Sequence, residues 1–72
     1  MTLRHFRIFL AVCERLRINE SARQLHISQP SVTQAIHEME NHYGILLFER
    51  LGRHIYLTAA GENLKQYAYQ IL

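Results

Sequence analysis

The sequence has few of the residues that disulfide frameworks, metal sites and membrane spans require. Cys13 is the only cysteine among 72 residues, so the chain can form neither an internal disulfide nor a cysteine-rich metal knuckle. No apolar run is long enough to cross a bilayer. Arg4 and Arg7 interrupt the apolar N-terminal stretch and no small-residue cleavage site follows, so we expect a mature helix there rather than a signal peptide. These absences suit the reducing cytoplasm.

The arrangements on which catalysis and cofactor binding depend are also missing. No nucleophile is paired with a general base and no phosphate-binding loop is visible, so we expect neither an enzyme nor a cofactor. His37 and His42 are five residues apart and fall on different faces of a helix, which argues against a metal site. The chain shows no repeats, low-complexity stretches or flexible linkers, and its length suits one small domain.

The excess of positive charge is small. A net charge of +2 would not by itself hold nucleic acid at physiological salt, so a polyanion partner would require charge to be placed locally. The hydrophobic fraction of 49% permits a core, but a chain this short buries a modest share of its surface. Help from a partner subunit would therefore be unsurprising.

Apolar residues recur at helical spacing over residues 3–16. The predicted stripe consists of Leu3, Phe6, Leu10 and Cys13, widened by Ile8, Phe9, Val12 and Leu16. A stripe this wide predicts a helix that packs on two sides, with Cys13 as inert packing. Ala11 is expected on the remaining face, beside Arg4, Arg7 and Arg15.

Two further helices are predicted on either side of a short turn. Asn19 is expected to cap the first, which runs to about Leu25 with Ala22 and Leu25 facing inward. Ser28 is expected to cap the second, and Pro30 fits its first turn, where backbone N–H groups have no helical partner. Its core stripe is Val32, Ile36, Met39 and Tyr43, and Gly44 is the predicted left-handed C-cap. Glu38 and Glu40 are expected to be surface charges.

Residues 46–57 predict a β-hairpin that turns near Gly52. Its expected core residues are Phe48, Ile55 and Leu57, and its expected outward residues are Arg50, His54 and Tyr56. Thr58 is the predicted cap of a last helix. The apolar stripe of that helix, which we expect to serve in dimerisation, consists of Leu64, Tyr67, Ala68 and Ile71.

Two helices joined by a three- to four-residue turn predict a helix-turn-helix over residues 18–37, with a wing over residues 46–57. The helix face opposite the core stripe holds Pro30, Gln34, His37 and Asn41, flanked by Thr33. Neutral amides and hydroxyls can discriminate bases, whereas a charged face would bind every sequence alike. A basic turn suits the electronegative minor groove. The expected DNA-binding residues are Ser28, Gln29, Pro30, Ser31, Thr33, Gln34, His37, Arg50 and Arg53.

The chain resembles the N-terminal domain of LysR-type transcriptional regulators from Leu3 to beyond Gly61. The densest matches are "ESARQLHISQPSVTQAI", "ENHYGILLFERLGRHIYLT" and "AAGENL". The resemblance implies a mainly α winged helix-turn-helix over residues 1–58, followed over residues 59–72 by the start of a linker helix that pairs protomers. It also implies a larger C-terminal domain that senses a small molecule, so we expect this chain to be a DNA-binding fragment. Gln34 departs from the family, in which many members have arginine at this position.

The same resemblance gives the expected partners. They are double-stranded DNA with an inverted-repeat operator and a second copy of the chain, with a tetramer possible in the full-length protein. A prokaryotic cytoplasm, at the nucleoid, is the expected location, with no membrane partner. Two alternatives remain from other classes: a winged-helix module that binds proteins, and a metal or pH sensor built on histidines. The arginines of the wing favour DNA over the first.

Overall fold

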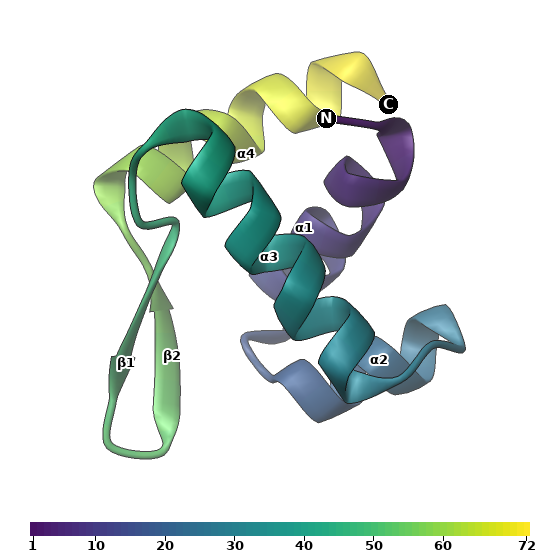
Figure 1. Cartoon of the computed structure of the whole chain (residues 1–72). Helices are drawn as coiled ribbons and strands as arrows, with labels where there is room; N and C mark the ends of the chain where they lie inside the picture. Colours follow the sequence, from purple (N-terminus) through teal and green to yellow (C-terminus); the bar gives the residue numbers. More distant parts are fainter.

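The computed structural model describes all 72 residues as four helices and one antiparallel hairpin (Figure 1). In chain order these elements are α1 (Leu3–Arg15), α2 (Ile18–Leu25), α3 (Gln29–Tyr43), β1 (Phe48–Leu51), β2 (His54–Leu57) and α4 (Ala59–Ile71). The architecture is the predicted winged helix-turn-helix with one further helix. None of the four helices combines the length and the apolar character that a membrane span needs.

Three of the helices begin at a hydroxyl cap. The side chain of Thr2 accepts a hydrogen bond from the His5 N–H, that of Ser28 from the Ser31 N–H, and that of Thr58 from the Gly61 N–H. These bonds satisfy backbone donors that have no partner inside the helix. The predicted caps at Ser28 and Thr58 are therefore confirmed.

The predicted cap at Asn19 is wrong. Helix α2 begins at Ile18 after an extended Arg17, and no side chain caps it. Ile18 is half-buried against the core, so its packing brings the helix start forward of the polar residue. The inward orientation of Ala22 and Leu25 is confirmed, since Ala22 is buried and Leu25 packs on the core.

Left-handed residues end the first three helices. The φ angle is 54° at Leu16, 59° at His26 and 68° at Gly44. Glycine adopts this conformation readily, whereas residues with a Cβ do so at a cost. The predicted C-cap at Gly44 is confirmed, and the sharp turns around α2 are made by residues other than glycine.

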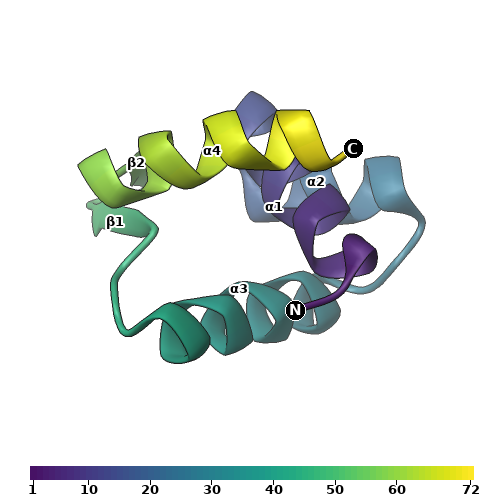
Figure 2. The same ribbon diagram turned by 90° about the horizontal axis from the view of Figure 1, so that it is seen from above.

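Helix α1 is the centre of the core, with α3 and α4 on opposite sides of it (Figure 2). Its two-sided packing is confirmed, because seven consecutive or nearly consecutive residues are buried: Phe6, Ile8, Phe9, Leu10, Ala11, Val12 and Cys13. Ala11, which was predicted to lie outside the apolar stripe on the face shared with the arginines, is buried as well. Helix α2 covers it, and the Ser21 hydroxyl donates to the Ala11 carbonyl oxygen over 3.3 Å. Leu3 and Leu16, at the ends of the stripe, remain exposed.

The inner face of α3 packs through Val32, Ile36 and Met39, as predicted, and through Ala35. Tyr43 was also expected in this stripe, but 38% of its surface is exposed. It lies in the last turn of α3 and outside the cluster of buried residues, so the helix continues past the core.

The two strands pair in the register Phe48↔Leu57, Glu49↔Tyr56, Arg50↔Ile55 and Leu51↔His54, and Gly52 turns with a φ of 63°. Phe48, Ile55 and Leu57 are half-buried, as predicted. The outward orientation predicted for Arg50 is wrong, because directly opposed residues share a face and Arg50 opposes Ile55. Arg50 is nevertheless exposed, since the hairpin reaches beyond the helices (Figure 1).

The base of the hairpin is attached to three helices. The ring centroids of Phe48 and Phe9, a residue of α1, are 5.6 Å apart. Glu40 of α3 accepts a hydrogen bond through Oε2 from the Leu47 N–H at 2.8 Å, with the Phe48 N–H at 3.4 Å. The expectation that Glu40 is a surface charge is therefore wrong. Gly61 of α4 packs so closely that a Cβ there would clash with the Leu47 carbonyl oxygen and the Leu57 side chain.

Candidate nucleic-acid interface

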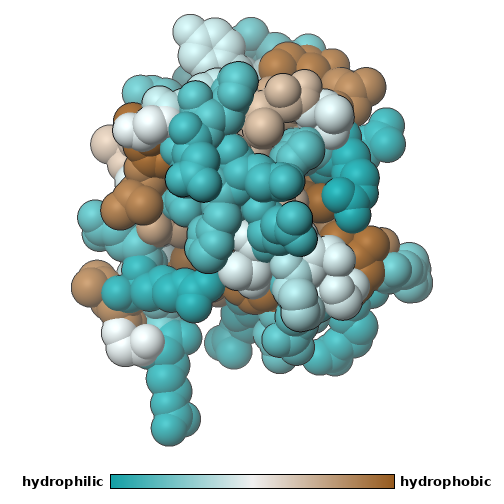
Figure 3. All heavy atoms as spheres, in the orientation of Figure 1, coloured by the Kyte–Doolittle hydropathy of each residue, from teal (hydrophilic) through white to brown (hydrophobic).

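The outer face of α3 forms a shallow hollow without a hydrophobic side chain. Seven residues line it: Gln29, Pro30, Thr33, Gln34, His37, Glu38 and Asn41. Figure 3 shows hydrophilic side chains gathered over the middle of this face. The structure thus brings together the predicted face of Pro30, Gln34, His37 and Asn41 with its flanking Thr33. Packing of the opposite face against α1 fixes the orientation of these side chains relative to the core.

The beginning of α3 borders this hollow with two serine hydroxyls. The Ser28 and Ser31 hydroxyls lie 2.8 Å apart, and Ser28 also accepts from the Ser31 N–H. Ser28 is exposed and Ser31 is half-buried. The first turn of a helix has a partial positive charge and the serine hydroxyls can donate hydrogen bonds, so this end suits an anion such as a phosphate.

A second hollow lies between the hairpin and the start of α2. Its lining residues are Leu16, Arg17, Ile18, Asn19, Gln29, Arg50, Gly52, Arg53, His54 and Ile55. Gln29 borders both hollows, so the polar face of α3 continues into a region with three arginines and no carboxylate. The positive charge that is sparse in the whole chain is therefore concentrated beside α3.

The predicted site residues Arg50 and Arg53 both lie in this arginine-lined hollow, and neither forms an ion pair. The neighbouring carboxylate, Glu49, opposes Tyr56 and projects to the other face of the hairpin. Both guanidinium groups are consequently free to bind an anion.

The sequence reasoning missed Arg17. This residue precedes α2 directly and lines the arginine hollow. Its contact with Glu20, at 3.6 Å, joins two exposed side chains, and such a pair holds little free energy. A correct prediction that α2 begins at Ile18 would have placed Arg17 at the start of this helix.

The interior holds no reactive group. Cys13 packs in the core, and burial raises the pKa of its thiol to about 12, so it remains protonated at neutral pH. No three side chains of histidine, cysteine, aspartate or glutamate lie close enough together to hold a metal ion.

Helix α4 divides its apolar stripe between the core and the surface. Ala68 is fully buried and Leu64 is half-buried against the core. Tyr67 is 64% exposed and Ile71 is 51% exposed. The expected stripe therefore has an inner part that holds α4 on α1 and an outer part that nothing within the chain covers.

The similarity of the chain to known regulators covers nearly all of it. Residues 3–62 match the family model of bacterial regulatory helix-turn-helix proteins of the lysR family. The chain is 46% identical over 72 residues to the transcriptional regulator TfdS of Cupriavidus pinatubonensis (strain JMP 134 / LMG 1197). It is equally similar over 72 residues to the Hca operon transcriptional activator HcaR of Escherichia coli (strain K12). The match includes the whole of this chain but only 24% of the length of each of these regulators.

Solved structures give the same result. The DNA complex of the CbnR DNA-binding domain superposes with a TM-score of 0.94 at 38% identity, over 99% of this chain and 82% of that one. The complex of the BenM DNA-binding domain with catB site 1 DNA gives 0.93 at 38% identity, over 99% and 80%. The matched family consists of transcription regulators, not enzymes. The chain therefore belongs to the lysR family of bacterial regulatory helix-turn-helix proteins and corresponds to their N-terminal DNA-binding domain.

Proposed function

We propose that this domain recognises specific sequences in double-stranded DNA as part of a transcription regulator. The observation that carries the proposal is the continuity of two surfaces: the polar hollow on α3, lined mainly by amides and hydroxyls with Glu38 as its one carboxylate, and the arginine-lined hollow beneath the hairpin, joined at Gln29. An uncharged face can read the donors and acceptors of base edges, while neighbouring arginines bind the backbone without regard to sequence. Domains of similar structure have been solved in complex with DNA.

Base reading is assigned to α3. Gln29, Thr33 and Gln34 line its hollow, and an amide pairs well with the N6 and N7 groups of adenine in the major groove. Pro30 and His37 lie on the same face and would contact the groove beside them. The hydroxyls of Ser28 and Ser31, at the helix start, are suited to a phosphate.

Backbone and minor-groove contacts are assigned to the arginines. Arg53 lies beside Gly52 at the tip of the hairpin, and Figure 3 shows a hydrophilic side chain projecting from this tip. A narrow minor groove has an enhanced negative potential that attracts inserted arginines. Arg50 and Arg17 line the wall of the hollow, where a phosphate would meet both.

The exposed part of α4 is assigned to pairing with a second copy. Tyr67 and Ile71 are available for this, together with the outer edge of Leu64, whereas Ala68 is occupied within the chain. Paired domains would place two α3 helices about one DNA turn apart on an inverted repeat. A tetramer, a small-molecule effector and a cytoplasmic, nucleoid-associated location belong to the same proposal for the longer protein.

Selection of bound sequences from random duplex DNA tests the function directly. We expect one enriched motif and an affinity that falls steeply with salt, since each neutralised phosphate contributes about 0.9 to the slope of log K against log salt. Absence of any enriched motif, together with a flat salt response, would reject DNA recognition and favour a module that binds proteins. Binding that disappears on addition of a chelator would favour the histidine sensor.

Sedimentation tests the pairing. We expect monomers at low micromolar protein and cooperative uptake of two chains by one palindromic duplex. Two independent binding events on that duplex, with no dimer at any concentration, would show that residues 59–72 do not suffice to pair the domains.

A further inference from the structure

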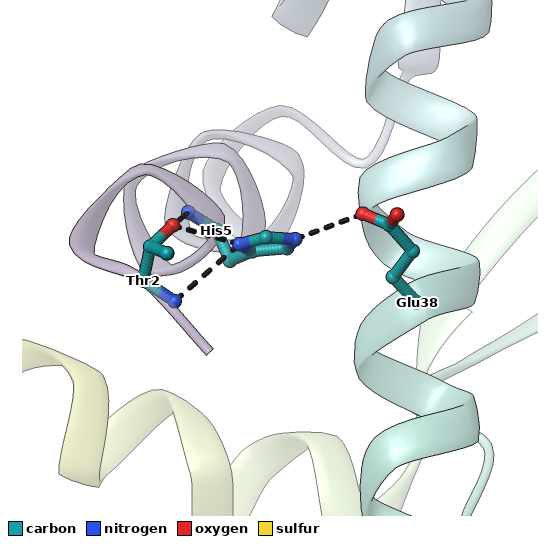
Figure 4. Close-up of polar contacts among 3 residues, drawn as sticks. All are labelled: Thr2, His5 and Glu38. Atoms are coloured by element: carbon teal, nitrogen blue, oxygen red, sulfur yellow. Dashed lines mark hydrogen bonds and ion pairs between the residues drawn. The ribbon is translucent and has the colours of Figure 1, made fainter.

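One hydrogen-bonded chain connects the start of α1 to the outer side of α3 (Figure 4). The His5 ring nitrogen Nε2 lies 2.9 Å from Oε1 of Glu38, although the two residues are 33 positions apart. On its other side, His5 Nδ1 lies 2.8 Å from the Thr2 hydroxyl. The His5 side chain is 15% exposed and that of Glu38 is 51% exposed, so the histidine forms the fixed end of the contact.

The capping box of α1 determines which ring nitrogen donates. The Thr2 N–H points to His5 Nδ1 at 3.4 Å, and this amide can only donate. Nδ1 must therefore accept, which leaves the proton of the neutral ring on Nε2. The Nε2–H donates to Glu38, so neutral His5 satisfies Thr2 and Glu38 together.

Glu38 has a distinctive position on the DNA-facing surface. It lies one helical turn after Gln34 and lines the α3 hollow, at the edge nearest α1. It is the only carboxylate among the residues of both hollows. Glu40, the other acidic residue of α3, is occupied by the Leu47 and Phe48 amides. A free carboxylate at this edge would repel the phosphates of a duplex seated on α3.

We propose that His5 is a positioning residue for DNA binding: it holds the Glu38 carboxylate against α1 and keeps it away from the phosphate backbone. The inference rests on the proposed function. It extends the DNA-binding machinery to the first turn of α1, which lies outside the helix-turn-helix and the hairpin. Thr2 supports the arrangement by orienting the imidazole ring.

A purely structural role would have a different signature. A hydrogen bond between partly exposed side chains contributes little to folding, so loss of His5 should affect DNA binding more than stability. The loss of DNA affinity should also depend on the charge of Glu38. A variant that removes this charge should cancel the effect of losing His5.

The test measures the affinity of single and double variants for the selected duplex. We expect His5→Ala to weaken binding roughly three- to tenfold, the size expected when a carboxylate moves to several ångströms from a phosphate in a high dielectric. Glu38→Gln alone should bind at least as well as the wild type, and His5→Ala with Glu38→Gln should bind as well as Glu38→Gln. His5→Gln retains a donor toward Glu38 and should keep most of the affinity.

Glu62→Gln is the matched control, because it removes the same charge from α4, on the far side of α1 from α3 (Figure 2). It should not rescue His5→Ala. Thermal unfolding of each variant, and the nitrogen-15 shifts of His5 in the free chain, report the fold and the Nε2–H tautomer without DNA. The inference would be overturned, with the proposed function left standing, by either of two results. One is a loss of affinity in His5→Ala that Glu38→Gln does not restore in the double variant, and the other is no loss of affinity in His5→Ala. Failure of the wild-type chain to bind any duplex would reject the proposed function and the inference with it.

Discussion

Helix α3 and the hairpin are neighbouring parts of one surface, but they are built in opposite ways. The inner face of α3 is buried through Val32, Ile36 and Met39, and its outer face presents mainly amides and hydroxyls, with the Glu38 carboxylate at one edge. The hairpin has strands of four residues each, and beyond its base the side chains are largely exposed. Its unpaired arginines reach into solvent. A fixed helix face of amides and hydroxyls suits discrimination between bases, and an extended, positively charged hairpin suits attraction to any duplex.

The largest expected effect comes from breaking the connection between these two regions. Glu40→Ala leaves the Leu47 and Phe48 amides without their acceptor, and hydrogen bonds to charged groups contribute about 1.5–3 kcal/mol each. We expect the free energy of unfolding in urea to fall by roughly 2–3 kcal/mol, with losses on specific and non-specific DNA together. Glu49→Ala, on the outer face of the hairpin, is the control and should change stability little. Equal stability of the two variants would contradict the proposed anchoring role.

A second change tests whether α3 reads bases. Gln34→Ala should cost roughly 1–3 kcal/mol at one base position and much less on non-specific DNA, because an amide lost from the major groove affects the base it recognised. Binding to duplexes substituted at each position in turn would locate the affected base pair. Equal losses on specific and non-specific duplexes would show that Gln34 touches the backbone instead.

A third change tests the hairpin as the part that binds without regard to sequence. Arg53→Ala should weaken all duplexes alike and lower the salt slope by about 0.9, the contribution of one phosphate. Lys65→Gln removes the same charge from α4 and should leave the slope unchanged. A selective loss on duplexes with a narrow minor groove would instead assign Arg53 to shape reading.

The smallest expected effect at neutral pH is that of ionisation of the Cys13 thiol, which lies in the core that supports both regions. The pKa of the Cys13 thiol is raised from 9.0 to about 12, so folded chains keep the proton where unfolded chains lose it. Stability from this group is complete below pH 9 and is lost as the pH rises toward 12. The difference in unfolding free energy between the wild type and Cys13→Ala should therefore be constant from pH 7 to about 8.5 and shrink above it. A constant difference up to pH 11 would contradict burial of the thiol.

Local signals in the sequence predict the elements well where the chemistry itself is local. Ser28, Pro30 and Gly44 define the two ends of α3 through capping and backbone preference, and the structure confirms each. The same reasoning fails at Asn19, where packing of Ile18 outweighs the better cap. It fails at Ala11 because a helical wheel shows the apolar stripe but not a second helix covering its polar side.

The candidate site divides in the same way. The outer face of α3 follows from helical spacing, so all its expected residues lie together. The roles of Glu40 and Glu38 could not be predicted, because each depends on a partner that only the tertiary fold brings near. The orientation of Arg50, by contrast, follows from the sequence once β1 is accepted, because Arg50 comes two residues after the inward-facing Phe48 and alternate residues of a strand share a face.

The left-handed residues at Leu16 and His26 have a consequence for protein engineering. A Cβ in this conformation costs about 1–2 kcal/mol, so each turn around α2 stores strain that glycine would relieve. Substitution by glycine also makes the unfolded chain more flexible, which opposes part of the gain. His26 is exposed and its backbone N–H already closes the helix end, so His26→Gly offers a route to a more thermostable domain that leaves the DNA-facing residues intact.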